Sequence, residues 1–446
     1  MWIPIPLGSN RPWAWSIMQI MIFSLFIGCV WSQKHLPWLG LKEYSLPIVL
    51  WLFYLTLLIL QILPIPATLL SDLSPNALFV QQHSNDGLFY LSVDHGQSQI
   101  SLLKSVSYFC LFLVTLMLIR DTKTLKALLY TILIAATLQA LYGSLEILIG
   151  VKHSIIFHLP VKEISTGSFV YKNHFANYLM LGLCAGIGIM VATLQTNRTN
   201  NNRDLIRSIV NTLLSSKALV RISLVILVIA LVMSKSRMGN TAFFTSMSIC
   251  GLLALILIKN RNKSLTILIV SMFVIDLFIV SAFFGLDKVQ ERLTQTSLSQ
   301  ETRDEVVIDA LPIISDFPFF GTGGGSFYGI FPQYKRAEVH GFYDHAHNDY
   351  LQMTIEHGVP ATLLLAILVL LSLYKALYAM RNRKKSILKG AAFAVSMATI
   401  GMLIHMTVDF PLQAPANAGN FVVFLALAWV INVIKTTPKP DRKITV

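Results

Sequence analysis

The hydrophobic pattern of this chain consists of apolar runs of about 20 residues, the length that an α-helix needs to cross a bilayer. Shorter polar segments separate most of them. The runs start near residues 14, 46, 102, 127, 174, 218, 238, 264, 360, 390 and 419. The pattern therefore predicts an all-α integral membrane protein with about eleven transmembrane helices. We expect residues 1–446 to form a single polytopic membrane domain.

One polar segment, residues 285–359, is much longer than the others. Within it, Glu301–Leu311 has apolar residues on one helical face and acids on the other, which predicts a helix. Asn348 is a good N-cap for a second helix, and Gly358 with Pro360 should end that helix before the next span. The sequence thus predicts one long, partly helical loop outside the membrane.

Composition and charge agree with a membrane protein. Hydrophobic residues make up 54% of the chain, charged residues 13%, and the mean hydropathy is +0.64. A net charge of +13 would also suit a nucleic-acid-binding protein, but the cations are not gathered on one patch. They occupy alternate loops, at 120–126, 198–217, 259–263, 381–385 and 435–443. This positive-inside pattern places those loops in the cytoplasm and predicts no nucleic-acid partner.

The loops between them are then extracytoplasmic: 64–101, 150–172, 234–239, 285–359 and 408–418. All four cysteines, Cys29, Cys110, Cys184 and Cys250, fall in apolar runs, so we expect no disulfide in the long loop. The start of the chain shows no cleavable signal peptide. An odd number of spans with a cytoplasmic tail puts the N-terminus outside, which suggests a missed helix or an upstream start.

Asp344–Leu351, in the long loop, holds the densest group of chemically useful side chains. His347 directly precedes the expected Asn348 cap, where the positive end of the helix dipole disfavours imidazolium. A neutral imidazole is what a general base needs. His345 would share a face with His347 in an extended strand, which permits a shared metal ion with Asp344. A base, a metal site and structural hydrogen bonding are all open interpretations here.

Cations stand near two other helix starts on the same side. Lys172, followed by Asn173, opens the fifth run, where it suits either a phosphate group or simple interfacial packing. Arg237 lies in the turn 234–240, and it suits either a lipid headgroup or the diphosphate of a lipid-linked substrate. Arg303, in the long loop, either joins such a site or pairs with a neighbouring acid on an exposed helix.

Taken together, these residues resemble the bacterial superfamily of O-antigen ligases and O-antigen or exopolysaccharide polymerases. The family pattern in the last large loop is His, then Asn, Ser or Gln, then nine residues, Gly, two residues and Gly. Here it reads His347, Asn348, the nine residues from Asp349 to His357, and Gly358, with Ala361 in the final place.

Further segments add to this resemblance. Ser236–Gly239 is similar to the turn that holds the family's first arginine, Arg303 resembles the second, and Lys172–Asn177 resembles an Asn-x-x-Ala segment. Weaker similarities to exopolysaccharide-type members lie at 9–13, 91–94 and 409–411. The resemblance is densest over 160–420, and the family usually has about twelve spans.

The resemblance implies a metal-independent, inverting glycosyltransferase of the bacterial inner membrane, with no cofactor and an active site facing the periplasm. The donor would be an oligosaccharide on undecaprenyl diphosphate, surrounded by membrane lipids. The acceptor would be a sugar hydroxyl of a lipid-linked repeat, as in a polymerase, or of lipid A-core, as in a ligase; the weaker similarities favour a polymerase. His347 would be the base, and Arg237 and Arg303 would neutralise the diphosphate. Candidate substrate-binding residues are Lys172, Asn173, Tyr334, His345, Asn348 and Glu356.

A transporter is the alternative from another class. Glu146, Asp276 and Asp409 would then form an ion path. Transporters often carry inverted repeats and broken helices near the membrane midplane, and the sequence shows neither. Its polar residues gather in a loop instead, which favours the enzyme.

Overall fold

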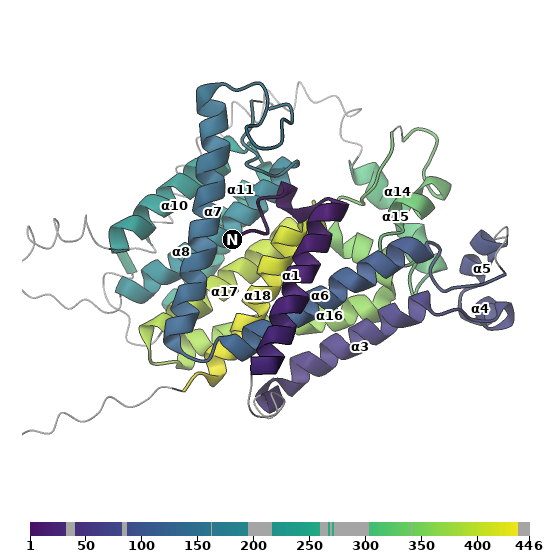
Figure 1. Cartoon of the computed structure of the whole chain (residues 1–446), viewed down its shortest axis with the longest axis horizontal. Coiled ribbons are helices and arrows are strands. Elements are labelled where there is room, and N and C mark those ends of the chain that lie inside the picture. Colours follow the sequence, from purple (N-terminus) through teal and green to yellow (C-terminus); the bar gives the residue numbers. More distant parts are fainter. Residues whose placement is uncertain are drawn as a thin grey trace, which may run out of the picture.

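The computed structural model describes residues 1–32, 41–82, 87–161, 163–194, 216–258, 266–267, 270–271, 303–339 and 341–435. These residues form helices and no strands (Figure 1). The long helices are α1 (Pro12–Ser32), α3 (Ser45–Ile62), α6 (His95–Leu118), α7 (Thr122–Ile149), α8 (Lys172–Leu194), α10 (Ser216–Met233), α11 (Arg237–Leu257), α16 (Asp349–Asn382), α17 (Ser386–His405) and α18 (Pro415–Val433). The short helices are η1 (Leu7–Ser9), η2 (Lys42–Tyr44), α4 (Ala67–Leu73), α5 (Pro75–Gln81), α14 (Arg303–Asp316), α15 (Phe327–Ile330), η4 (Phe331–Gln333) and η5 (Pro411–Gln413).

The long helices match the predicted spans. Within the described residues, nine are long and apolar enough to cross a membrane, and the apolar part of α10, Ala218–Met233, is slightly shorter. Every predicted start falls on one of these helices except the one near residue 264, which lies almost entirely outside the described residues. The prediction of an all-α integral membrane protein is therefore confirmed, and the chain is a multi-pass membrane protein.

The bundle has a buried centre and a lipid-facing periphery. In the most apolar stretch of α8, 94% of the residues are buried, and in that of α18, 83% are. In the corresponding stretch of α1, only 28% are buried. Figure 1 shows α17 and α18 between the other long helices. A helix that is apolar all round can be buried only among other helices or in lipid. The exposed isoleucines and leucines of α1, α10 and α11 therefore mark the lipid-facing side.

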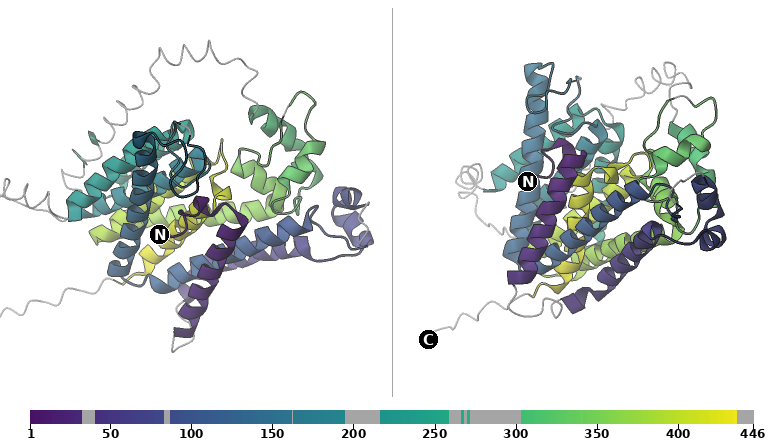
Figure 2. Two further views of the ribbon diagram at one scale, coloured as in Figure 1. Left: turned by 45° about the horizontal axis from the view of Figure 1, so that its top comes forward. Right: turned by 45° about the vertical axis from the view of Figure 1, so that its right-hand side comes forward.

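A second, separate hydrophobic core lies outside the bundle. It joins α4 and α5 to α14, α15 and the start of α16, with buried members such as Leu70, Val306 and Ile355 (Figure 2). The Asn76 side chain donates to the Asp316 carbonyl at 3.0 Å. The Val93 amide donates to the Thr322 carbonyl at 2.8 Å. We call this part, residues 64–93 and 303–355, the loop lobe; it confirms a long, partly helical loop over its described residues.

Hydrogen bonds hold the predicted extracytoplasmic loops at one end of the bundle, which we call the loop end. The Ser165 amide donates to the Met233 carbonyl at 3.1 Å, which joins the loop 150–172 to the turn after α10. The Asp349 amide donates to the Asp409 carbonyl at 3.2 Å, which joins the long loop to 408–418. The N-terminal residues lie there too, because Ser168 Oγ donates to the Pro4 carbonyl at 2.6 Å.

Gly358 divides α16 into two helices. Its backbone has φ 81° and ψ 165°, inside a helix that continues to Asn382. The expectation that the first helix ends at Gly358 and Pro360, before the next span, is therefore confirmed, and the next helix begins directly after Gly358. Pro360 permits this because a proline near the start of a helical segment lacks an N–H that would be unpaired anyway. The first part of α16 belongs to the loop lobe and the second part to the bundle.

Candidate active site

The start of α16 has the local geometry that the sequence predicted. Asn348 is its N-cap, and the side-chain oxygen accepts from the Leu351 amide at 3.0 Å. The Asn348 amide group donates to the Thr407 carbonyl at 3.0 Å, which fixes the cap against the end of α17. His347 precedes the cap with φ 52°, a left-handed conformation that turns the chain into the helix.

Phe410 is surrounded by four aromatic side chains. Its ring stacks on His345, with centroids 4.5 Å apart, and on Tyr171 at 5.4 Å. The His347 and His174 rings lie nearly perpendicular to it, at 4.9 and 5.0 Å. Both histidines of the predicted site therefore contact one hydrocarbon ring from a different loop. Phe410 was not among the candidate residues, because a phenylalanine in an apolar chain carries no chemical signal.

Asn173 joins three helix starts. Its oxygen accepts from the Ser236 hydroxyl at 2.7 Å, and Ser236 is the N-cap of α11. Its nitrogen donates to the carboxylate of Asp409, whose backbone carbonyl accepts from the first amide of α16. The starts of α8, α11 and α16 thus meet at the loop end. Helix starts carry partial positive charge and free N–H groups, so their convergence favours an anion.

The cations Lys172 and Arg237 are the first residues of α8 and α11. Arg237 is exposed, and it directly follows the buried Ser236 that bonds Asn173. The Lys172 ammonium donates to the Lys235 carbonyl at 3.3 Å, which holds the two helix starts together. These contacts bring Lys172, Asn173 and Arg237 into one region.

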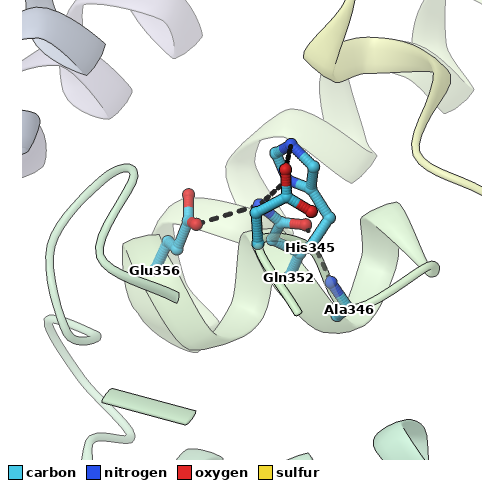
Figure 3. Close-up of polar contacts among 5 residues, drawn as sticks. His345, Ala346, Gln352 and Glu356 are labelled. Atoms are coloured by element: carbon cyan, nitrogen blue, oxygen red, sulfur yellow. Dashed lines mark hydrogen bonds and ion pairs between the residues drawn. The ribbon is translucent and has the colours of Figure 1, made fainter. Parts of the chain in front are cut away.

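His345 connects this region to the loop lobe. The Gln352 side chain donates to His345 Nδ1 and to Glu356 Oε1, both at 3.0 Å (Figure 3). Glu356 Oε2 accepts from the Gly325 amide at 2.9 Å. Glu356, a predicted substrate-binding residue, is only 4% exposed, and both its oxygens bond to protein groups. Burial lowers the pKa of His345, which favours the neutral ring, although the Asp344 carboxylate opposes this shift.

Two predicted residues have no described contact with this group. The Tyr334 hydroxyl donates to Asp316 Oδ2 at 2.6 Å inside the loop lobe. Burial, the hydrogen bond to Asp316 and its charge raise the pKa of Tyr334. Arg303 begins α14, whose buried face packs against α16, but its side chain lies outside the described part of the structure. Roles for both residues stay predictions.

Buried polar side chains inside the bundle were largely missed by sequence reasoning. His405 Nδ1 lies 2.9 Å from the Asn177 amide nitrogen, and both side chains are fully buried. A histidine inside an apolar run was the signal that could have found them. Glu146, considered for an ion path, accepts from the Ile155 amide at 3.0 Å and so fixes the loop after α7. Asp276 lies outside the described residues.

One family model matches this chain, under the description O-antigen ligase, over residues 222–366. The matched region holds Arg237, Arg303, His345, His347 and Glu356. The segments around Asn173 and Phe410 lie outside the match, but the contacts above place them against it. No curated protein matches the chain. The match confirms the resemblance drawn from the motifs: this multi-pass membrane protein carries, over residues 222–366, a region of the O-antigen ligase-related superfamily.

Proposed function

We propose that this protein is an inverting glycosyltransferase that acts at the loop end of the bundle. It transfers a glycan from an undecaprenyl diphosphate carrier to a sugar hydroxyl, without a metal ion. The loop end faces the periplasm, and the membrane is the bacterial inner membrane. The family match supports a function of the O-antigen ligase or polymerase type. The finer assignment depends on the geometry of the loop end.

The observation that carries the proposal is the meeting of three helix starts through Asn173. A lipid-linked sugar has its charge on the diphosphate, at the level where the apolar lipid ends. Converging helix starts, together with Lys172 and Arg237, provide positive potential at that level. The planar guanidinium of Arg237 would donate two parallel hydrogen bonds to two diphosphate oxygens, a geometry that a lysine ammonium does not offer. Arg303 is proposed as the second arginine.

His347 takes the proton in this scheme. The acceptor hydroxyl gives its proton to the imidazole while its oxygen bonds to the anomeric carbon of the donor. The bond from that carbon to the phosphate oxygen breaks, and the electron pair leaves with the diphosphate. The arginines stabilise the negative charge that develops on this leaving group. A single displacement of this kind inverts the anomeric configuration.

We propose a second lipid-linked repeat as acceptor, which makes the protein a polymerase. The support is the similarity of residues 409–411 to exopolysaccharide-type members, since Phe410 of that segment contacts His347. Purified protein supplied only with the lipid-linked repeat should then produce chains of several repeats. Products that appear only when lipid A-core is added would replace this acceptor by that of a ligase.

The test of the base uses His347→Ala, His345→Ala and the exposed loop histidine variant His153→Ala as control. Transfer is measured with the purified protein, and donor binding is measured separately. His347→Ala should reduce the rate by about 10²–10⁴-fold with donor binding retained. His345→Ala should lose less, and His153→Ala nothing. Chelators should leave the rate unchanged; inhibition that an added divalent ion reverses would overturn the base and revive a metal at Asp344, His345 and His347.

A further inference from the structure

We propose that Phe410 is a positioning residue that fixes the imidazole of His347 for proton transfer. This inference rests on the proposed function, because it assumes that His347 is the base. Phe410 lies in the turn between α17 and η5, outside the family match and more than sixty residues from His347 in sequence. Its role follows from what its ring and its backbone contact.

The Phe410 ring is nearly enclosed. It is 7% exposed, and its contacts come from the starts of both α8 and α16. His345 and Tyr171 stack on it, whereas His347 and His174 meet it at interplanar angles of 75° and 90°. Aromatic rings in such arrangements attract one another beyond simple burial and restrict each other's rotation. One ring therefore orients both histidines of the candidate site.

The Phe410 backbone is as well fixed as the ring. Its amide N–H is held in place because it donates to Asp409 Oδ1 at 2.9 Å. Its carbonyl accepts from the Gln413 amide at 3.1 Å. The preceding carbonyl, that of Asp409, accepts from the first amide of α16. The Phe410 backbone is thus bonded to the start of α16, which His347 directly precedes. These bonds keep the Phe410 ring and the His347 imidazole in a fixed relative orientation.

His347 needs such support from outside its own helix. Its left-handed backbone places it before the N-cap, so the helix does not define its side-chain direction. The Phe410 side chain has no hydrogen-bonding group, so its ring can fix the plane of the imidazole without occupying either ring nitrogen. A general base must reach its proton at about 2.6–3.2 Å, so a small rotation of the imidazole is costly for the rate.

The test is a double-mutant cycle on turnover. Phe410→Leu keeps an apolar side chain but removes the flat ring. It should lower kcat by about 10–100-fold, with the KM for the lipid-linked donor changed by less than about threefold. In the His347→Ala background, assayed over long times, Phe410→Leu should change the remaining rate by less than about twofold, because the group it positions is gone.

Phe243→Leu is the matched control. Phe243 is 2% exposed in α11 and packs against Phe244, and its described ring contacts do not include His345 or His347. It should lower the melting temperature in detergent as much as Phe410→Leu does, yet leave kcat unchanged. An equal kcat loss in Phe243→Leu would show that lost packing explains the effect and would overturn the inference.

The cycle also separates the two proposals. If His347→Ala is nearly inactive and Phe410→Leu still removes a further tenfold, Phe410 acts independently of the base, and only this inference fails. If Phe410→Leu raises KM and leaves kcat intact, Phe410 serves substrate binding, which also overturns it. If His347→Ala keeps the wild-type rate, the proposed base fails, and the positioning role fails with it.

Discussion

Single side chains determine how the loop end is held together. Asn173 uses both ends of its amide to connect an N-cap hydroxyl with a buried carboxylate. Gln352 donates from its amide nitrogen to both His345 and Glu356, and its oxygen accepts from the Ala346 amide at 3.2 Å. Amides suit such positions because one side chain offers a donor and an acceptor together. The Asn173 amide also fixes the starts of α8 and α11. Lys172 and Arg237, the first residues of these helices, therefore lie at fixed positions.

Arg237→Ala should reduce turnover by about 10²–10³-fold, since in the proposed mechanism it removes a charge that stabilises the leaving group. Arg237→Lys should recover only part, because an ammonium cannot bond two phosphate oxygens in parallel. Steady-state assays of the purified variants measure this. Arg221→Ala, at an exposed arginine near the other end of α10, is the control and should be fully active. If Arg237→Ala matched it, Arg237 would be a headgroup contact instead.

At the residue scale, sequence reasoning predicted side chains that carry reactive or charged groups. It missed side chains that matter only because of what they contact in the folded protein. Asn348 and His347 were found because a cap and its preceding residue can be seen in a short stretch. Phe410 was noticed only within the weak similarity at 409–411, and its contact with His347 could not be predicted, because it joins two distant segments through a hydrocarbon ring. Glu356 was assigned to substrate because its partners, Gly325 and Gln352, depend on how the loop lobe folds.

Among the helices, α16 is the one whose form matters most for the site. Its first part carries the N-cap and Gln352 in the loop lobe, and its second part crosses the bundle. Gly358 lets the two parts differ in direction. The Val359 amide donates to the Pro318 carbonyl at 2.9 Å, so the lobe is fastened at the same point.

Gly358→Ala should destabilise the protein strongly. Its φ and ψ lie in a region that only glycine adopts readily, which costs other residues about 1–3 kcal/mol. An added Cβ would also lie 2.3 Å from the Phe319 carbonyl oxygen. Gly329→Ala, where a Cβ meets nothing within 4 Å, should be neutral within about 0.5 kcal/mol. Thermal unfolding in detergent compares the two, and equal melting temperatures would contradict the strain.

The sequence predicted element positions well and the form of α16 incompletely. Apolar runs locate spans because the bilayer requires a continuous apolar length. A glycine followed by a proline predicts where the first helix ends, but not the direction that the next helix takes relative to it. That outcome depends on the backbone of residues 318–321, which packs against Gly358.

For the molecule as a whole, the loop end and the opposite end should lie on different sides of the membrane. Lys152 and Lys384 are exposed at these two ends, and the four native cysteines are buried. A thiol placed at Lys152→Cys should react with an impermeant maleimide in spheroplasts. Lys384→Cys should react only after permeabilisation, because the basic loops are expected in the cytoplasm. Equal labelling of both before permeabilisation would refute this topology.

The alternation of basic loops predicted which of the remaining loops share a side of the membrane. In the structure, the described parts of these remaining loops lie together at the loop end. The alternation could not predict the loop lobe, because the core of the lobe is assembled from two segments that the sequence separates by several spans.

That separation has a consequence for biosynthesis. The Asn76–Asp316 hydrogen bond spans 240 residues, so α4 and α5 leave the ribosome long before their partners. At about 5–20 residues per second, the delay is on the order of tens of seconds. During this interval Leu70 and Ala77, both fully buried in the finished protein, have no core to join. The nascent chain therefore exposes part of a hydrophobic core outside the bundle until residues 303–355 have been synthesised. Chains that stop earlier would present that surface to chaperones and proteases.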